Sequence, residues 1–175
     1  MKKKQPRKRK HPKQRRNNMN IQIEMENGGI IKAELYPDVA PTTVENFVKL
    51  INENFFDGLV FHRVIEGFMI QGGGFDAVGN HKEADSIKGE FDANGVKNEL
   101  KHDRGVLSMA RTMFPNSASS QFFIMHQKAP HLDGQYAAFG KVTDGMDVVD
   151  EIATCQTAPD DSPVIPQVIK TITII

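Results

Sequence analysis

The sequence predicts a mainly β protein, a closed antiparallel β-barrel with two helices over its ends. Several short runs alternate apolar and polar residues, which is the period of a half-buried strand. Two longer segments carry apolar residues at the spacing of an amphipathic helix. Turn signals rich in Gly, Asn and Asp separate these segments. Many short strands joined by such turns, together with two helices, favour a closed barrel.

A β-hairpin opens the globular part of the chain. Apolar residues occupy every second position over 21–25 and again over 31–35. The turn between these strands is Asn27-Gly28-Gly29, whose residues accept the positive φ angles of a tight hairpin.

The first helix is predicted to follow the hairpin and to end near Asn54. Thr42 and Glu45, directly after Pro41, have the spacing of a capping box at its start. Its buried stripe has the spacing i, i+3, i+4, i+7 and consists of Val44, Phe47, Val48 and Ile51.

The remaining elements follow from the same two periods. Residues 72–104 are polar and rich in Gly, Asp, Asn and Lys, so no strand or helix is predicted there. A loop of that length is usually functional or held by its neighbours. Strands are predicted at 60–65, 68–71, 106–110, 121–125, 138–142 and 168–175, and a short helix at 146–153.

Charge divides the 175-residue chain into two parts. Residues 1–18 contain ten basic and no acidic residues, whereas 19–175 contain 12 basic and 22 acidic residues, a net charge of −10. Because the acidic part repels phosphate, the chain as a whole is not a nucleic-acid binder. Its 39% apolar residues support a core and exclude disorder throughout. We therefore expect a disordered basic arm over 1–18 and one domain over 19–175.

The arm has two interpretations that the sequence leaves open. One is contact with RNA, ribosomes or an anionic membrane through residues 2–16, with an affinity that falls steeply with salt. The other is a solubilising extension. The chain has no run near the roughly 20 apolar residues of a membrane span, and no apolar segment of a secretory signal follows the basic start. With Cys155 as the single cysteine, we predict a cytoplasmic protein. Nothing in the sequence demands an oligomer, so we expect a monomer.

Spacing excludes three kinds of site. Gly74 and Gly79 are spaced like the glycines of a P-loop, but Asn80-His81 stands where Lys-Ser/Thr is required. No serine lies in the Gly-x-Ser-x-Gly motif of a hydrolase, and the histidines have no carboxylate pair at metal-ligand spacing. No metal and no cofactor are therefore expected. The glycines at 72–74 are expected to give the backbone freedom around a turn.

One arginine lies inside an apolar strand run. Alternation places Phe61, Arg63 and Ile65 on one face of the strand. A guanidinium among apolar side chains needs a partner, because burying an unpaired charge is costly. From the residues alone, a structural arginine bonded to carbonyls or a carboxylate and a ligand-binding arginine are both open. A second run, 120–125, sets aromatic residues beside a side-chain amide.

Five segments carry a family resemblance. They are FHRVIEGFMIQGGG at 61–74, LSMART at 107–112, SSQFFI at 119–124, LDGQYAAFGKV at 132–142 and DGMDVVDEI at 144–152. In this order the chain closely resembles the cyclophilin family of peptidyl-prolyl cis–trans isomerases from about residue 19 to 175, and most closely its compact bacterial cytoplasmic branch. The resemblance implies an eight-stranded barrel and an enzyme that accelerates rotation about X–Pro peptide bonds without a cofactor.

The resemblance also implies a role for each motif residue. Arg63 would donate a hydrogen bond to the substrate's prolyl nitrogen, and Gln71 would support the arginine. Phe123 would form the floor of a proline pocket. The other residues that would contact the proline ring or the flanking peptide are Phe68, Met69, Ala110, Gln121 and Leu132.

The chain departs from the family pattern at three places. It has no Trp, and His131 stands where the members most sensitive to cyclosporin carry one, so weak inhibition by cyclosporin is expected. Tyr136 replaces a frequent His and can still cover the pocket. One additional residue in the 109–115 loop leaves the contacts of Arg111 and Thr112 undetermined, so neither is assigned to the site.

A non-catalytic module that binds proline peptides is the alternative function, since some members of the family act chiefly by binding. The complete set of Arg, Phe, Met and Gln motif residues favours catalysis. The expected partners are proline-containing peptides and unfolded or folding protein chains.

Overall fold

The computed structural model describes residues 18–175. The basic arm predicted over 1–18 therefore lies outside the described residues, apart from Asn18. The side-chain amide of Asn18 donates to Glu34 Oε1 at 2.7 Å. Within the described range no helix combines the length and the apolar character needed to cross a bilayer.

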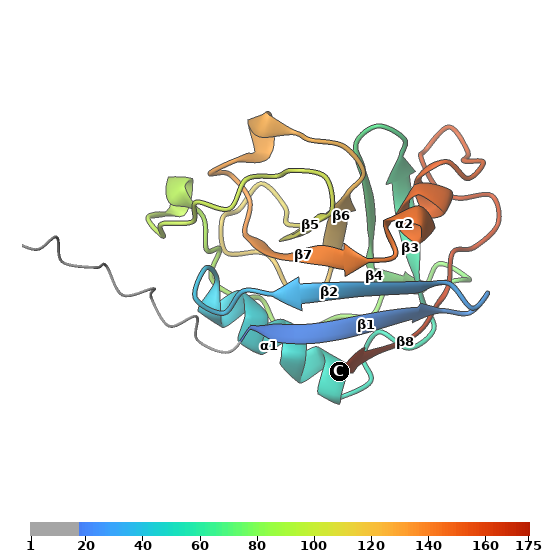
Figure 1. Ribbon diagram of the computed structural model, residues 1–175, viewed down its shortest axis with the longest axis horizontal. Coiled ribbons are helices and arrows are strands. Elements are labelled where there is room, and N and C mark those ends of the chain that lie inside the picture. The colour runs from blue at the N-terminus through green and yellow to red at the C-terminus, as the bar shows by residue number, and fades with distance from the viewer. Residues whose placement is uncertain (1–17) are drawn as a thin grey trace, which may run out of the picture.

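Eight antiparallel strands form one sheet in the order β3-β4-β6-β5-β7-β2-β1-β8. The two edge strands meet through a bridge between Val60 and Val168, and Phe61 N–H donates to the carbonyl of Gln167 at 3.0 Å. The sheet therefore closes almost completely, and the expected barrel is confirmed (Figure 1). The strands are β1 Met19–Met25, β2 Ile30–Leu35, β3 Leu59–Ile65, β4 Met69–Asp76, β5 Val106–Met109, β6 Phe122–Met125, β7 Ala138–Asp144 and β8 Ile169–Ile174.

Two helices cover the barrel, as the periodicity predicts. Helix α1 spans Pro41–Asn52 and lies along the lower edge in Figure 1, whereas α2 spans Met146–Ala153 and lies at the right. Phe47 projects from α1 into the core, where its ring lies 5.0–5.2 Å from the rings of three other phenylalanines. Short 3-10 turns at Asp92–Asn94 and Pro130–Leu132 complete the secondary structure of the described residues.

The opening hairpin forms from the two predicted strands and the predicted turn. Met19 pairs with Leu35 at one end and Glu24 with Ile30 at the other. Gly28 turns the chain with a φ of +92°, a value that glycine adopts without strain. Buried residues alternate with more exposed ones along both strands, so the apolar positions of the sequence pattern are the ones that face the core.

The predicted capping box at the start of α1 is wrong. The helix begins at Pro41 with Ala40 as its N-cap, and no side chain caps it there. The buried carboxylate of Glu90 instead accepts the backbone N–H of Thr43 at 2.6 Å and its hydroxyl at 2.8 Å. A residue 47 positions away in the chain therefore satisfies one of the open helix N–H groups.

The predicted turn at glycines 72–74 is also wrong, because all three lie inside β4. A Cβ on Gly72 would lie 2.6 Å from the carbonyl oxygen of Val60, and one on Gly73 would lie 2.9 Å from that of Ser120. Gly74 faces the side chain of Gln121 in the same way, at 2.5 Å. These glycines allow close approach of neighbouring segments.

The long polar connection after β4 is held in place by the body of the protein. The buried amide of Asn98 donates to the backbone carbonyls of Glu90 and Ala138, at 3.0 and 2.9 Å. Together with the Glu90–Thr43 bonds, these contacts fix the segment that leads into β5 and the candidate site.

Candidate active site

A β-bulge sets the direction of Arg63. Phe61 pairs with Gly72 and Arg63 with Gln71, so His62 is an additional residue on β3. The bulge reverses the alternation: Phe61 and Val64 point into the core, whereas Arg63 is exposed. The prediction that Phe61 and Arg63 share a face is therefore wrong, and the charge of Arg63 is not buried.

The Arg63 guanidinium is aligned by a chain of amides. Its Nη1 donates to Gln71 Oε1 at 3.4 Å, and Gln71 Nε2 donates to Gln121 Oε1 at 3.0 Å. Gln71 is opposite Arg63 in the β3–β4 register. Within residues 18–175 Arg63 forms no ion pair with a carboxylate, so the structural-arginine interpretation has no carboxylate partner and the donor groups stay available.

A hollow of about 190 Å³ lies beside this guanidinium, and we call it the Arg63 pocket. Met69, Phe123 and Leu132 provide its apolar surface, and each is at most 7% exposed. They belong to a second apolar cluster, separate from the main barrel core. The complete lining is Arg63, Phe68, Met69, Gln71, Ala110, Arg111, Phe123, Leu132 and Tyr136.

The structure brings eight of the ten predicted residues together around this pocket. The other two, Gln121 and His131, do not line the pocket but contact residues that do. Gln121 contacts the pocket through its bond to Gln71. The ring of His131 lies 5.8 Å from that of Phe68, with an angle of 33° between the planes, so it borders the pocket without lining it.

Arg111 is the lining residue that the sequence did not predict. Its guanidinium donates to the backbone carbonyl of Gln135 twice, at 2.7 and 3.2 Å. It also lies over the rings of Tyr136 and Phe91, 4.6 and 4.8 Å from their centroids. Arg111 thereby holds Tyr136 at the rim. Arg111 belongs to the LSMART segment, which could have indicated it. The additional residue in the 109–115 loop left its contacts undetermined, so it was not assigned to the site.

The floor of the pocket rests on a buried imidazole. The ring of Phe123 stacks on that of His102, with centroids 6.0 Å apart and planes 20° apart. His102 Nδ1 lies 3.0 Å from Asp133 Oδ1, and its Nε2 lies 2.8 Å from the hydroxyl of Ser108. Burial lowers the pKa of His102, although the bond to Asp133 opposes this shift. The imidazole is therefore neutral at pH 7.

Asp133, His102 and Ser108 are hydrogen-bonded in the arrangement of a hydrolase triad, although the sequence contains no hydrolase motif. Ser108 is fully buried, with 0% of its surface exposed. Its hydroxyl cannot reach a substrate, so the chain Asp133–His102–Ser108 supports Phe123 and cannot supply a nucleophile. No group of three His, Cys, Asp or Glu residues arranged to hold a metal occurs within 18–175.

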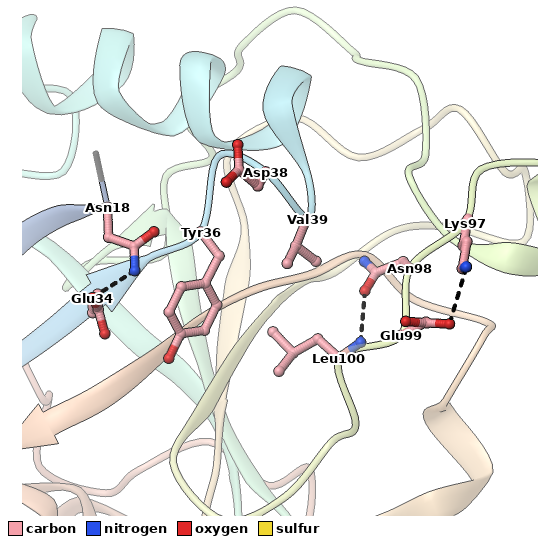
Figure 2. Close-up of a pocket in the computed structure, with 9 residues that line it drawn as sticks. All are labelled: Asn18, Glu34, Tyr36, Asp38, Val39, Lys97, Asn98, Glu99 and Leu100. Carbon is pink, nitrogen blue, oxygen red and sulfur yellow. Dashed lines mark hydrogen bonds and ion pairs between the residues drawn. The ribbon is translucent and has the colours of Figure 1, made fainter. Parts of the chain in front are cut away.

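A larger hollow of about 570 Å³ lies on another part of the surface, beside β2 and the 97–100 segment (Figure 2). Its edges carry carboxylates, with Glu34 bonded to Asn18 and Glu99 paired with Lys97 at 3.2 Å. It contains none of the residues predicted for the site. The largest hollow is therefore not the one that gathers the predicted residues.

Comparison with known proteins gives one consistent result. Residues 20–174 match the family model described as cyclophilin type peptidyl-prolyl cis-trans isomerase/CLD. The chain is 46% identical over 138 residues to peptidyl-prolyl cis-trans isomerase CYP18-1 of Arabidopsis thaliana, covering 78% of this chain and 84% of that protein. It is 47% identical over 123 residues to peptidyl-prolyl cis-trans isomerase B of Bacillus subtilis, covering 70% and 82%.

The fold agrees with these sequence relationships. The crystal structure of a cyclophilin-type isomerase from Cryptosporidium parvum superposes with a TM-score of 0.78 at 31% identity, covering 91% of this chain and 98% of that one. Sequence and fold thus coincide with one family over almost the whole described chain. The chain belongs to the cyclophilins and is a peptidyl-prolyl cis–trans isomerase.

Proposed function

We propose that Arg63 donates a hydrogen bond to the prolyl nitrogen of an X–Pro bond while the Arg63 pocket holds the proline ring. The amide rotates over a barrier of about 18–20 kcal/mol because the nitrogen lone pair is delocalised into the carbonyl. A cationic donor directed at that nitrogen favours the pyramidal, localised lone pair of the twisted transition state. No bond needs to break, so the mechanism is non-covalent.

The hydrogen bond from Arg63 is too weak to account for the expected acceleration alone, so the pocket must contribute as well. An acceleration of about 10⁵-fold needs roughly 7 kcal/mol, whereas one charge-assisted hydrogen bond supplies about 1.5–3 kcal/mol. Holding the ring against Met69, Phe123 and Leu132 while the preceding carbonyl swings supplies the remainder through orientation and exclusion of water. The low exposure of these three side chains supports this division.

The Gln71–Gln121 pair acts in this proposal as the support of the donor. Its amide chain holds the guanidinium on the pocket side of β3, with Arg63 Nη1 3.4 Å from Gln71. Ala110 would contact the peptide before proline, and Tyr136 and His131 would border the bound ring. The single observation that carries the proposal is the exposed, carboxylate-free guanidinium beside a buried apolar floor.

The substrates we infer are unfolded or folding chains that contain proline. A structure of the Cryptosporidium parvum protein was determined in the presence of the dipeptide Ala-Pro, with a TM-score of 0.76 to this chain. We further infer a cytoplasmic protein of the compact bacterial branch, on the motifs and the single cysteine. A non-catalytic binding role is the competing function.

A protease-coupled assay on an X–Pro test peptide decides between catalysis and binding. Arg63→Ala is expected to lower kcat/KM by about 100-fold or more, and Lys141→Ala, which removes an exposed cation of β7, is the matched control. Near-normal turnover by Arg63→Ala would remove the arginine from the mechanism. Absence of turnover by the unaltered chain would favour the binding module.

A further inference from the structure

A second hollow adjoins Arg63 on β3. It measures about 420 Å³, against about 190 Å³ for the Arg63 pocket, and Arg63 lines both. Three segments form its walls: the start of β3 with His62, the end of β4 with the turn that follows, and the 160–166 loop. We call it the His62 pocket. A peptide held in the Arg63 pocket can extend across the shared arginine into this second hollow.

Two carboxylates lie on its walls, and Arg63 is the one cationic residue in the lining. Asp76 accepts the backbone N–H groups of Asn80 and Val78, at 2.9 and 3.0 Å. Asp160 Oδ1 accepts the hydroxyl and the backbone N–H of Ser162. These hydrogen bonds lower the pKa of both groups, so both are ionised at pH 7. Neither forms an ion pair within the described part of the chain.

Apart from Arg63, the remaining wall is apolar or neutral. Phe75, Pro163 and Pro166 supply carbon surface. The ring of His62 packs 4.7 Å from that of Phe75, and its Nδ1 is the one buried side-chain nitrogen or oxygen of residues 18–175 that has no hydrogen-bond partner. Burial, followed by the nearby charge of Arg63, lowers the pKa of His62. The imidazole is therefore neutral at pH 7 and adds no positive charge to the hollow.

The charge of Arg63 does not cancel this preference. Its bonded nitrogen, Nη1, is directed to Gln71, which lines the Arg63 pocket and not the His62 pocket. The lining of the His62 pocket thus carries two carboxylates and one cation, which it shares with the Arg63 pocket. An acidic side chain in this hollow would meet both carboxylates, whereas a long cationic side chain would meet opposite charge.

We propose that the His62 pocket is a second subsite for the same substrate chain and binds a Lys or Arg side chain near the isomerised proline. The methylene stem packs on Phe75 and the two prolines, and the charged head lies between Asp76 and Asp160. This inference rests on the proposed function and deepens it, because it names the sequence context in which the enzyme holds its substrate best.

The chain offers a closely matched pair of variants. Asp160→Asn removes the charge from the pocket and keeps an oxygen that can accept both Ser162 bonds. Asp161→Asn removes the same charge one residue later, outside the lining, where a φ of +65° suits Asn. Both variants therefore keep the loop, and only the first alters the proposed subsite.

The test titrates the full chain with X–Pro peptides in which one Lys is moved from three residues before proline to three after it. Each has a norleucine counterpart, which keeps the stem and lacks the charge. At one position the Kd for norleucine is expected to exceed that for Lys about threefold or more at low salt. That ratio falls to about 1 in Asp160→Asn and persists in Asp161→Asn.

The outcomes separate the two levels of the proposal. Ratios near 1 at every position overturn the subsite even if every peptide is isomerised. A Lys preference that survives in Asp160→Asn also overturns it, because the cation then binds elsewhere. A preference abolished by Asp160→Asn in a protein that does not catalyse isomerisation supports the subsite and refutes the catalytic proposal.

Discussion

The imidazole of His102 lies almost parallel to the ring of Phe123, with 6.0 Å between the centroids and 20° between the planes. His102 is in turn fixed at both nitrogens, by Asp133 and by Ser108. The floor of the Arg63 pocket therefore rests on a polar chain that is itself buried. We therefore expect stability and substrate binding to be coupled at this point.

Phe123→Ala should lower both the stability of the protein and its affinity for substrate. The substitution removes a side chain that is 5% exposed and opens the space between the pocket and His102. We expect a loss of about 3 kcal/mol in the free energy of unfolding and a rise in the Kd for proline peptides. Urea denaturation and peptide titration measure the two effects. Unchanged peptide affinity in the folded variant would mean that Phe123 is not the floor of the binding site.

The stability should fall on mild acidification because of His102. Its pKa is lowered by burial in the folded protein, whereas in the unfolded chain it is about 6.5. Below about pH 7 the imidazole is therefore protonated in the unfolded chain and still neutral in the folded protein. As a result, the free energy of unfolding falls as the pH drops from about 7 toward the lowered pKa. His62, whose pKa is also lowered, adds to the fall.

Unfolding of the unaltered chain and of His102→Gln at pH 7.5 and 5.5 measures this contribution. The difference between the two pH values should be smaller in His102→Gln. The control His131→Gln removes an exposed imidazole whose charge is only a minor cause of the lowered His102 pKa, so it should retain most of the difference. An equal difference in all three proteins would show that His102 is not the titrating group.

Gly74→Ala should lower activity more than stability. Its Cβ would lie 2.5 Å from the side chain of Gln121, which can move because its far end is flexible. Moving Gln121 breaks its bond to Gln71 and loosens the support of Arg63. We expect kcat/KM to fall about tenfold, with less than about 1.4 kcal/mol lost from the free energy of unfolding. Full activity in this variant would show that the amide chain does not position the arginine.

Cyclosporin should inhibit this enzyme weakly. His131 borders the pocket beside Phe68, at the position where sensitive relatives have a Trp whose indole donates a hydrogen bond to the drug. His131→Trp should strengthen inhibition at least tenfold in the isomerase assay. Nanomolar inhibition of the unaltered chain would contradict the expectation.

Local periodicity predicted most of the fold. Alternation located all eight strands, and helical spacing located both helices, with α2 correct to the residue. These features depend on which face of a segment is buried, and a single segment reports that. The sheet order and the closing pair β3–β8 were not predicted, because strand pairing depends on segments far apart in the chain.

The errors have the same physical origin. The bulge at His62 depends on how β3 meets β4, so alternation within β3 placed Arg63 on the wrong face. Glu90 caps α1 from a distant loop, and the glycines of β4 are required by segments that pack against them. Arg111 was missed because its position depends on the path of a loop. Each of these contacts joins residues that are distant in sequence.

The central claim is that Arg63 stabilises the twisted amide, and the rate of cis–trans rotation of enzyme-bound substrate tests it most directly. Exchange NMR at saturating peptide gives the cis–trans interconversion rate of bound substrate, free of any change in affinity. If Arg63 stabilises the twisted amide, that rate falls about 100-fold or more in Arg63→Ala and is unchanged in Lys141→Ala. An equal on-enzyme rate in Arg63→Ala would show that the pocket alone accelerates rotation, and the proposed role of the guanidinium would be wrong.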